Sequence, residues 1–331
     1  MLPNRRAFSL TCVAALLGAG LRAAHGQGDR RPRVGYFSIG PVVDPPSVER
    51  AAFLDGLAQE GMPAGRAVEM LYASAEGNVE FADDVARDLV ARHPSVIVAS
   101  GGIALLALHK STRDVPVVIL AVGDPVGLGL VDSLGRPGRN FTGSSFVSSE
   151  LAAKRVQLLH EVAPQARRMA LVFDRRNHNA RLETDATAAA ARAAGVEPVV
   201  YGIDDDQGLT DTLARIDAGR VRSLYVVFEG NIVARRRVEI AEFTIARRLP
   251  SISGWAGLAE AGCLLSYGPD IEAMFRRGAH YVASILRGAR TSELPVEQAS
   301  RFEFAINVRT AAAIGLKLPQ NLLLRATRII D

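Results

Sequence analysis

The feature that most constrains this chain is a repeated alternation of short apolar runs with longer helical patterns. The runs are rich in β-branched residues, and most are continuously apolar instead of alternating with polar residues. Such runs are typical of strands that a parallel sheet buries on both faces. The predicted strands are Val34–Phe37, Val68–Tyr72, Val96–Ala99, Val117–Val122, Met169–Phe173, Pro198–Ile203, Leu224–Phe228, Pro250–Ser253, Cys263–Tyr267 and Phe302–Ile306.

The segments between these runs carry helix signals. Ser47 and Asp270 can each cap a helix whose apolar residues lie on one face. Ser148 or Ser149 can begin a further helix, and a terminal helix is expected after the last strand. Repeated strand–helix units of this kind predict a doubly wound α/β fold.

The strand–helix pattern falls into two halves. The strands of the first half occupy residues 33–122, and a second set begins at Met169. Gly123–Ser149, between them, is rich in Gly, Pro and Ser and lacks strong periodicity, which indicates an interdomain connection. At about 100–200 residues per domain, the length of the chain also suits two domains. Ligands bind at the carboxyl ends of parallel strands, so loops of both halves would meet one ligand in a cleft.

Residues 1–26 have the pattern of a signal peptide. A short positive stretch precedes an apolar one, and small residues suit cleavage between Gly26 and Gln27. Arg5 and Arg6, followed one residue later by Phe8, also resemble the twin-arginine export motif. Export by the Sec route and by the twin-arginine route therefore both stay open. The expected location of the mature protein is the periplasm.

Composition excludes several classes of function. The formal charge is +4, but without the three arginines of residues 1–26 there are 36 basic against 35 acidic residues. This balance gives no overall electrostatic footprint for nucleic acid. Only Cys263 remains after cleavage, so an internal disulfide is excluded. The chain carries no P-loop, nucleophile elbow or zinc motif, and we expect no catalytic residue, cofactor or metal.

Several blocks of sequence carry a specific resemblance. Gly123–Gly127 and Arg136–Gly143, in this order and spacing, form the most specific pair. Further blocks are Phe53–Leu57, Val96–Gly102, Ser266–Pro269 and Leu294–Gln298. The chain thereby resembles the bacterial ABC-transporter substrate-binding protein family, whose better-studied members bind tryptophan or other amino acids. It is similar, more broadly, to type I periplasmic binding proteins.

The resemblance implies two Rossmann-like lobes with parallel sheets, joined by a hinge of three chain crossings. These crossings are expected near Ser144–Ser149, Ser266–Pro269 and Glu297–Phe304. Lobe 1 would then comprise residues 32–147 plus 268–296, and lobe 2 residues 148–267 plus 297–331. The implied protein is a monomer that captures a small solute and delivers it unchanged to an ABC permease in the inner membrane.

Two alternatives stay open beside solute import. The same fold could act as a ligand sensor for a membrane receptor. The chain could also be an enzyme that uses the carboxylates of Asp124, Asp174 and Glu229, which follow or end separate predicted strands.

Residues at or after the ends of predicted strands are the candidate ligand contacts. Ser100-Gly101-Gly102 precedes a helical run, so its free N–H groups suit a carboxylate unless it is a plain Gly-rich turn. Glu229 could pair with an ammonium group or cap a helix, and Trp255 could stack on a ligand or pack in the core. This pattern favours an amino acid or a related amphoteric solute. The candidates are Ser38, Ser100, Gly101, Gly102, Asp124, Ser145, Asp174, Asn177, Glu229, Trp255 and Tyr267.

Overall fold

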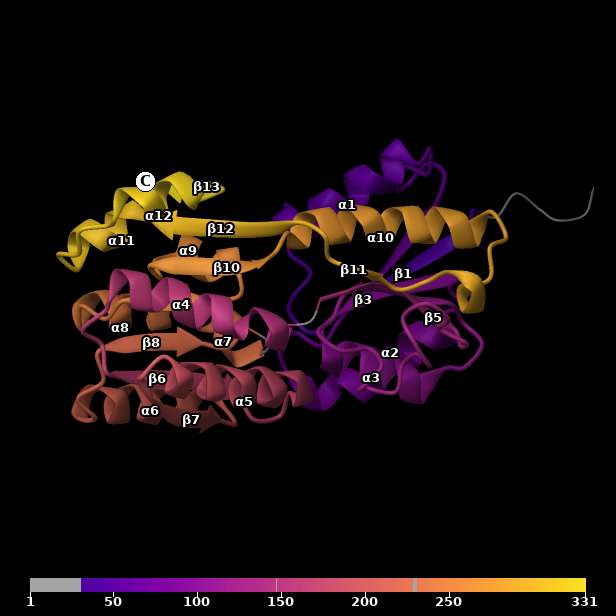
Figure 1. Cartoon of the computed structure of the whole chain (residues 1–331). Coiled ribbons are helices and arrows are strands. Elements are labelled where there is room, and N and C mark those ends of the chain that lie inside the picture. The colour runs from indigo at the N-terminus through magenta and orange to yellow at the C-terminus, as the bar shows by residue number, and fades with distance from the viewer. Residues whose placement is uncertain (1–30, 147, 229–230) are drawn as a thin grey trace, which may run out of the picture.

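The computed structural model describes residues 31–146, 148–228 and 231–331. They form two lobes, each built around one sheet with helices on both faces (Figure 1). The predicted signal peptide and the candidate Glu229 lie outside the described residues. Among the residues described, no helix combines the length and the apolar character that crossing a membrane requires.

Lobe 1 contains a six-stranded sheet in the order β11-β5-β4-β3-β1-β2, with all its pairings parallel. Its strands are β1 (Arg33–Ser38), β2 (Glu69–Ser74), β3 (Val96–Ser100), β4 (Val117–Ala121), β5 (Phe141–Ser145) and β11 (Glu297–Gln298). One face packs against α1 (Val48–Gln59) and α10 (Ile271–Leu286), and the other against α2 (Ala82–Ala91) and α3 (Gly102–Ser111). Two short 3₁₀ helices, η1 (Val79–Phe81) and η3 (Thr291–Glu293), complete this lobe.

Lobe 2 contains a seven-stranded sheet in the order β13-β12-β10-β9-β8-β6-β7. Its strands are β6 (Arg168–Asp174), β7 (Glu197–Ile203), β8 (Ser223–Val226), β9 (Ser251–Ser253), β10 (Leu265–Pro269), β12 (Phe302–Asn307) and β13 (Arg328–Ile330). One face is covered by η2 (Ser148–Leu151), α4 (Ala152–Val162), α5 (His178–Ala193), α11 (Val308–Ala313) and α12 (Gln320–Arg325). The other is covered by α6 (Asp206–Ala218), α7 (Asn231–Arg235), α8 (Arg237–Ala246) and α9 (Ala256–Ala261).

The first five strands of each sheet follow the same doubly wound order. In lobe 1 the chain order reverses between β1 and β3, and in lobe 2 it reverses between β6 and β8. Such reversal points open a crevice at the carboxyl ends of the strands, where ligands bind in α/β sheets. The predicted class, two doubly wound α/β lobes with largely parallel sheets, is confirmed.

The chain passes between the two sheets three times. It does so between β5 and η2, between β10 and α10, and between β11 and β12. As a result α10 packs along α1, although the two helices lie far apart in the sequence (Figure 1). Gly268 must be a glycine at the second passage, because an added Cβ would overlap the carbonyl oxygen of Gly254.

Strand pairing at the passages differs in detail from the predicted segments. Glu297 and Gln298 pair with β5 and therefore lie in the first sheet, whereas the predicted boundary placed them in lobe 2. Gly268 and Pro269 pair with β12 and lie in the second sheet. Strand pairing continues two residues past each predicted lobe boundary, along β10 in the second sheet and along β11 in the first, which accounts for both shifts.

Three strands were not predicted, the two-residue β11 among them, and one pairing departs from the parallel pattern. β5 falls within the segment interpreted as a connection, because Phe141–Ser145 is short and largely polar although it is buried. β13 follows the expected terminal helix, because α12 begins after Pro319 and ends at Arg325, and Arg328–Ile330 then pair with β12. β12 runs antiparallel to β10, so the second sheet is mixed.

Candidate functional site

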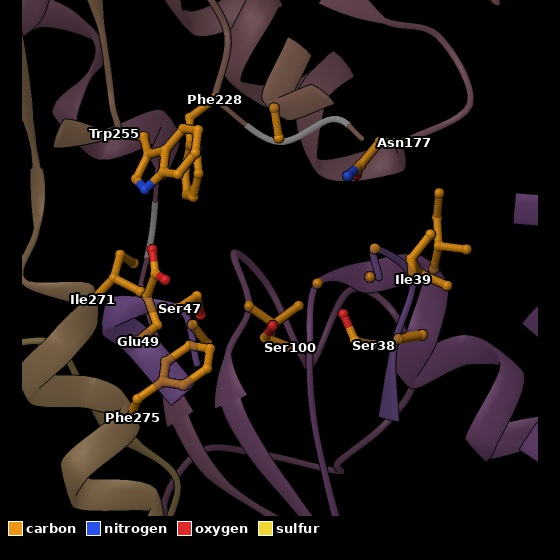
Figure 2. Close-up of a pocket in the computed structure, with 18 of the residues that line it drawn as sticks. Ser38, Ile39, Ser47, Glu49, Ser100, Asn177, Phe228, Trp255, Ile271 and Phe275 are labelled. Carbon is orange, nitrogen blue, oxygen red and sulfur yellow. The ribbon is translucent and has the colours of Figure 1, made fainter. Parts of the chain in front are cut away.

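A cavity of about 320 Å³ lies between the two lobes, at the carboxyl ends of their strands. Figure 2 shows Trp255, Phe228 and Asn177 of lobe 2 on one side of it, and Ser38, Ser100, Glu49 and Phe275 of lobe 1 on the other. Its lining comprises Tyr36, Ser38, Ile39, Gly40, Ser47, Glu49, Ser100, Gly101, Gly102, Ile103, Ala104, Ala121, Val122, Phe146, Asn177, Phe228, Ala234, Trp255, Ile271 and Phe275.

The reversal point of the first sheet forms one wall of this cavity. Ser38 ends β1, and Ser100 ends the adjacent β3. Gly101 then adopts a φ of +80° as the residue before α3, and α3 begins at Gly102. A positive φ favours glycine, and an added Cβ at Gly101 would meet nothing within 4 Å. The first N–H groups of α3 lack partners within the helix and carry its positive dipole, so this wall suits an anionic group.

An acidic side chain stands beside this wall. Glu49 lies in the first turn of α1, directly after the cap residue Ser47, whose hydroxyl accepts a hydrogen bond from the N–H of Arg50. The side chain of Glu49 is half-buried and reaches toward Trp255 (Figure 2). The cavity therefore combines a site for an anion with a carboxylate that can accept hydrogen bonds from a cation.

Three aromatic rings, tilted relative to one another, form a continuous row along the cavity. The centroids of Phe146 and Phe228 are 5.9 Å apart with an interplanar angle of 33°. Those of Phe228 and Trp255 are also 5.9 Å apart, at 30°. The guanidinium carbon of Arg237 lies 6.0 Å from the centroid of the Trp255 ring. Such a row offers an aromatic surface to a ligand.

Asn177 approaches the first lobe from the opposite side. Its side-chain oxygen accepts hydrogen bonds from the N–H groups of Asn179 at 2.9 Å and Ala180 at 3.4 Å, which caps α5. The same oxygen lies only 3.9 Å from the position that a Cβ on Gly102 would occupy. The start of α5 and the start of α3 therefore face each other across the cavity.

Six of the predicted contacts line the cavity. They come from both halves of the chain, as the alternation of strands and loops implied, and they are Ser38, Ser100, Gly101, Gly102, Asn177 and Trp255. The other candidates that the structure describes do not line it.

Two predicted carboxylates have partners elsewhere. Asp124 accepts a hydrogen bond from the N–H of Gly127 at 2.8 Å and so holds the turn after β4. Asp174 is fully buried and accepts hydrogen bonds from Nε and Nη2 of Arg176, both at 3.1 Å. Each carboxylate therefore stabilises the loop after its own strand.

Ser145 and Tyr267 lie at the passages between the sheets. Ser145 is buried in β5 opposite β11. The ring of Tyr267 stacks on that of Phe302, with centroids 6.2 Å apart and an interplanar angle of 16°. Neither side chain is part of the cavity lining.

Several residues of the lining were not predicted. They are Tyr36, Ile39, Gly40, Ser47, Glu49, Ile103, Ala104, Ala121, Val122, Phe146, Phe228, Ala234, Ile271 and Phe275. Glu49 could have been predicted from the sequence. An acidic residue in the first turn of a helix that follows a strand lies at the carboxyl edge of the sheet. The apolar residues of the lining could not have been predicted, since an aromatic residue in a core and one in a cavity wall look alike in sequence. Within the described ranges, no cluster of three or more His, Cys, Asp or Glu side chains could hold a metal ion.

The sequence of this chain matches a known protein family. The model of the ABC transporter substrate binding protein family matches residues 40–330. A tyrosine-binding protein of Clostridioides difficile (strain R20291) is 24% identical over 284 residues, which span 85% of this chain and 81% of that protein.

Two solved structures are similar over nearly the whole chain. A conserved domain protein from Vibrio cholerae has 28% sequence identity and a TM-score of 0.83, with 91% of this chain and 100% of that chain covered. An ABC domain from Streptococcus pneumonia, solved in complex with L-Trp, has 23% identity and a TM-score of 0.83 over the same shares of the two chains. At 23% identity, the similarity to the Streptococcus structure shows a shared fold.

Proposed function

Because this chain belongs to the family of ABC transporter substrate-binding proteins, we propose that it binds one aromatic amino acid between its lobes and delivers it to a membrane permease. Its fold is that of type I periplasmic binding proteins. The proposal includes export by the signal peptide at residues 1–26, a periplasmic location and a monomeric state.

The observation that carries this proposal is the combination of three surfaces in one cavity. The start of α3 receives the carboxylate of the ligand, through the N–H groups that follow Gly101. Glu49 receives the ammonium group, and the ring of the ligand packs on Trp255. The cavity of about 320 Å³ lies at the small end of the roughly 300–1,000 Å³ of ligand pockets, which suits one amino acid better than a larger solute.

Two relatives support an aromatic side chain. One is the tyrosine-binding protein of Clostridioides difficile, and the other is the Streptococcus protein solved with L-Trp. The row of Phe146, Phe228 and Trp255 offers the matching aromatic surface in this chain.

Closure of the two lobes provides the binding mechanism. We place the lobes at the predicted boundaries, residues 32–147 plus 268–296 and residues 148–267 plus 297–331, with two shifts that strand pairing requires. Gly268 and Pro269 belong to lobe 2, and Glu297 and Gln298 belong to lobe 1. The three passages form the hinge. A ligand that touches both walls lowers the free energy of the closed form, because only closure supplies contacts from both lobes. Closure also excludes water, which strengthens each polar contact. The permease then recognises the closed form.

The two alternatives differ in what supports them. A sensor would use the same closure, and neighbouring genes for a permease and an ATPase would favour transport over it. The enzyme alternative used the carboxylates of Asp124, Asp174 and Glu229. Asp124 and Asp174 lie outside the cavity lining, and Glu229 lies outside the described residues. We therefore do not propose catalysis.

Calorimetry with a panel of amino acids tests the proposal. The protein without residues 1–26 is unfolded and refolded first, which removes any ligand that co-purifies. We expect one or more of L-tryptophan, L-tyrosine and L-phenylalanine to bind at one site per chain. Phenylpropionate, which lacks the ammonium group, and phenethylamine, which lacks the carboxylate, are matched controls that should bind much more weakly. Binding of a neutral or purely anionic solute, with no response to the panel, would reject the proposal.

A further inference from the structure

We infer that Arg235 is a latch that holds the two lobes together around the ligand and thereby slows its release. This inference rests on the proposed function, because a latch matters only if the lobes open and close. Arg235 does not line the cavity, and it acts as a positioning residue.

The latch is a hydrogen bond across the mouth of the cavity. Arg235 is the last residue of α7 in lobe 2, and its Nη1 donates to the carbonyl oxygen of Gly77 in lobe 1 at 2.9 Å. Among residues 31–146, 148–228 and 231–331, no other side-chain hydrogen bond joins the two lobes. Ala234, the residue before Arg235, lines the cavity, so the latch lies at its rim.

Backbone hydrogen bonds connect the turn that contains Gly77 to the lobe 1 wall of the cavity. Gly77 has a φ of +84° and follows Glu76, whose φ is also positive at 50°. The N–H of Gly77 donates to the carbonyl of Ile39 at 2.7 Å, and the N–H of Ala75 donates to that of Ser38 at 3.1 Å. Ile39 and Ser38 both line the cavity, so the position of the Gly77 carbonyl is coupled to the lobe 1 wall.

A carboxylate in lobe 2 orients the guanidinium. Nη2 of Arg235 lies 2.6 Å from Oδ1 of Asp206, the first residue of α6. The hydrogen bond from Arg235 is the main cause that lowers the pKa of Asp206, and the charge of Arg236 adds to it. Asp206 is therefore ionised near neutral pH, and it holds the Arg235 side chain extended toward lobe 1. Less side-chain entropy is then lost when the lobes meet.

Charges of opposite sign also attract each other between the two lobes. Hydrogen bonding to Asp174 raises the pKa of Arg176, and the negative charge of Glu80 in lobe 1 contributes to the same shift. Arg176 and Glu80 are both exposed, one on each lobe. The Arg235–Gly77 hydrogen bond forms only when the lobes are close. Losing it should therefore change the dissociation rate more than the association rate.

Dissociation kinetics of an Arg235→Ala variant test the latch. Trp255 is the only tryptophan and lines the cavity, so its fluorescence reports binding of L-tyrosine or L-phenylalanine. Loss of one net hydrogen bond predicts dissociation about three- to tenfold faster, with the association rate little changed. Asp206→Asn should produce a smaller increase, and Arg235→Lys should restore part of the wild-type rate.

Arg247→Ala is the matched control for this experiment. Arg247 is also an exposed arginine of lobe 2 and donates through Nη2 to Asp217 at 3.0 Å, within the same lobe. Its loss should leave both rates unchanged. A dissociation rate in Arg235→Ala equal to those of the wild type and of Arg247→Ala would overturn the latch and leave the proposed function intact.

A distance measurement keeps the latch testable if no amino acid binds. Spin labels on cysteines introduced at Ala91 in α2 and Ala214 in α6, both exposed, report the separation of the lobes, while the buried Cys263 stays unlabelled. The ligand-free labelled protein should show a population at short distance, and Arg235→Ala should shift it to longer distances. Identical distributions in the two proteins would overturn the latch, whereas failure of the amino-acid panel alone would overturn only the proposed function.

Discussion

A Glu183→Ala variant is expected to lose about 3–5 kcal/mol of free energy of unfolding, because it leaves the buried charge of Arg155 without its counter-ion. Arg155 and Glu183 are both completely buried, and Nη1 of Arg155 lies 2.7 Å from Oε1 of Glu183. Burial opposes the charge of Arg155, but Tyr225 and Glu183 outweigh it and raise the pKa of Arg155. A guanidinium is not deprotonated in proteins, so Arg155 keeps its charge in the variant.

The partners of this ion pair explain why its loss should be costly. Glu183 also accepts hydrogen bonds from the hydroxyls of Ser148 at 2.6 Å and Tyr225 at 2.8 Å. Nε of Arg155 donates to the carbonyl of Tyr267 at 2.6 Å. Ser148 and Tyr267 lie next to two of the passages between the sheets. The network thus joins α4, α5 and β8 to the segments that we propose as the hinge.

Urea unfolding, followed through the fluorescence of Trp255 in the same lobe, measures this effect. The double variant Arg155→Met, Glu183→Leu should be less destabilised than Glu183→Ala, because it removes both charges together. Arg247→Ala, which breaks an exposed ion pair, should change stability by no more than about 1 kcal/mol. Equal midpoints for Glu183→Ala and the wild type would show that the buried pair contributes little.

A Glu49→Gln variant is expected to bind its amino acid at least about 30-fold more weakly. Truncating one partner of a charge pair that closure buries costs about 2–5 kcal/mol, and 1.4 kcal/mol corresponds to a factor of ten. The neutral amide fills the same space, so the loss measures the charge and not the shape of the cavity. Calorimetry on the folded variant gives the affinity directly.

Glu69→Gln provides the matched control for this measurement. Glu69 is an exposed acid at the start of β2, at the opposite end of the sheet from the cavity. Its replacement should leave the affinity unchanged. If Glu49→Gln bound as tightly as Glu69→Gln, the ammonium group of the ligand would have to be recognised by another residue.

The sequence allowed the fold to be predicted where packing leaves a local signature. Central strands such as Val96–Ser100 and Val117–Ala121 are buried on both faces, and their continuous apolar runs reflect that burial. The helix caps Ser47 and Asp270 were also predicted, since the side chain of each accepts a hydrogen bond from a backbone N–H in the first turn. β5 left no such signature, because its position is decided by pairing with β4 and β11 and not by its own residues.

The site was predictable only as far as topology determines it. Ser38, Ser100 and Trp255 follow or end strands, and the carboxyl ends of parallel strands must lie together. The same rule could not separate Asp124 and Asp174 from true cavity residues, since it does not say which way a side chain turns. Phe146 lies in the segment that follows β5 and connects the lobes, and it lines the cavity. Only the tertiary structure determines that position.

A crystal structure of the protein with its bound aromatic amino acid is the most direct test of the central claim that both lobes hold the ligand. We predict the carboxylate of the ligand at the N–H groups at the start of α3, its ammonium group at Glu49 and its ring against Trp255. A ligand bound to one lobe only, or outside the cavity between the lobes, would contradict this account.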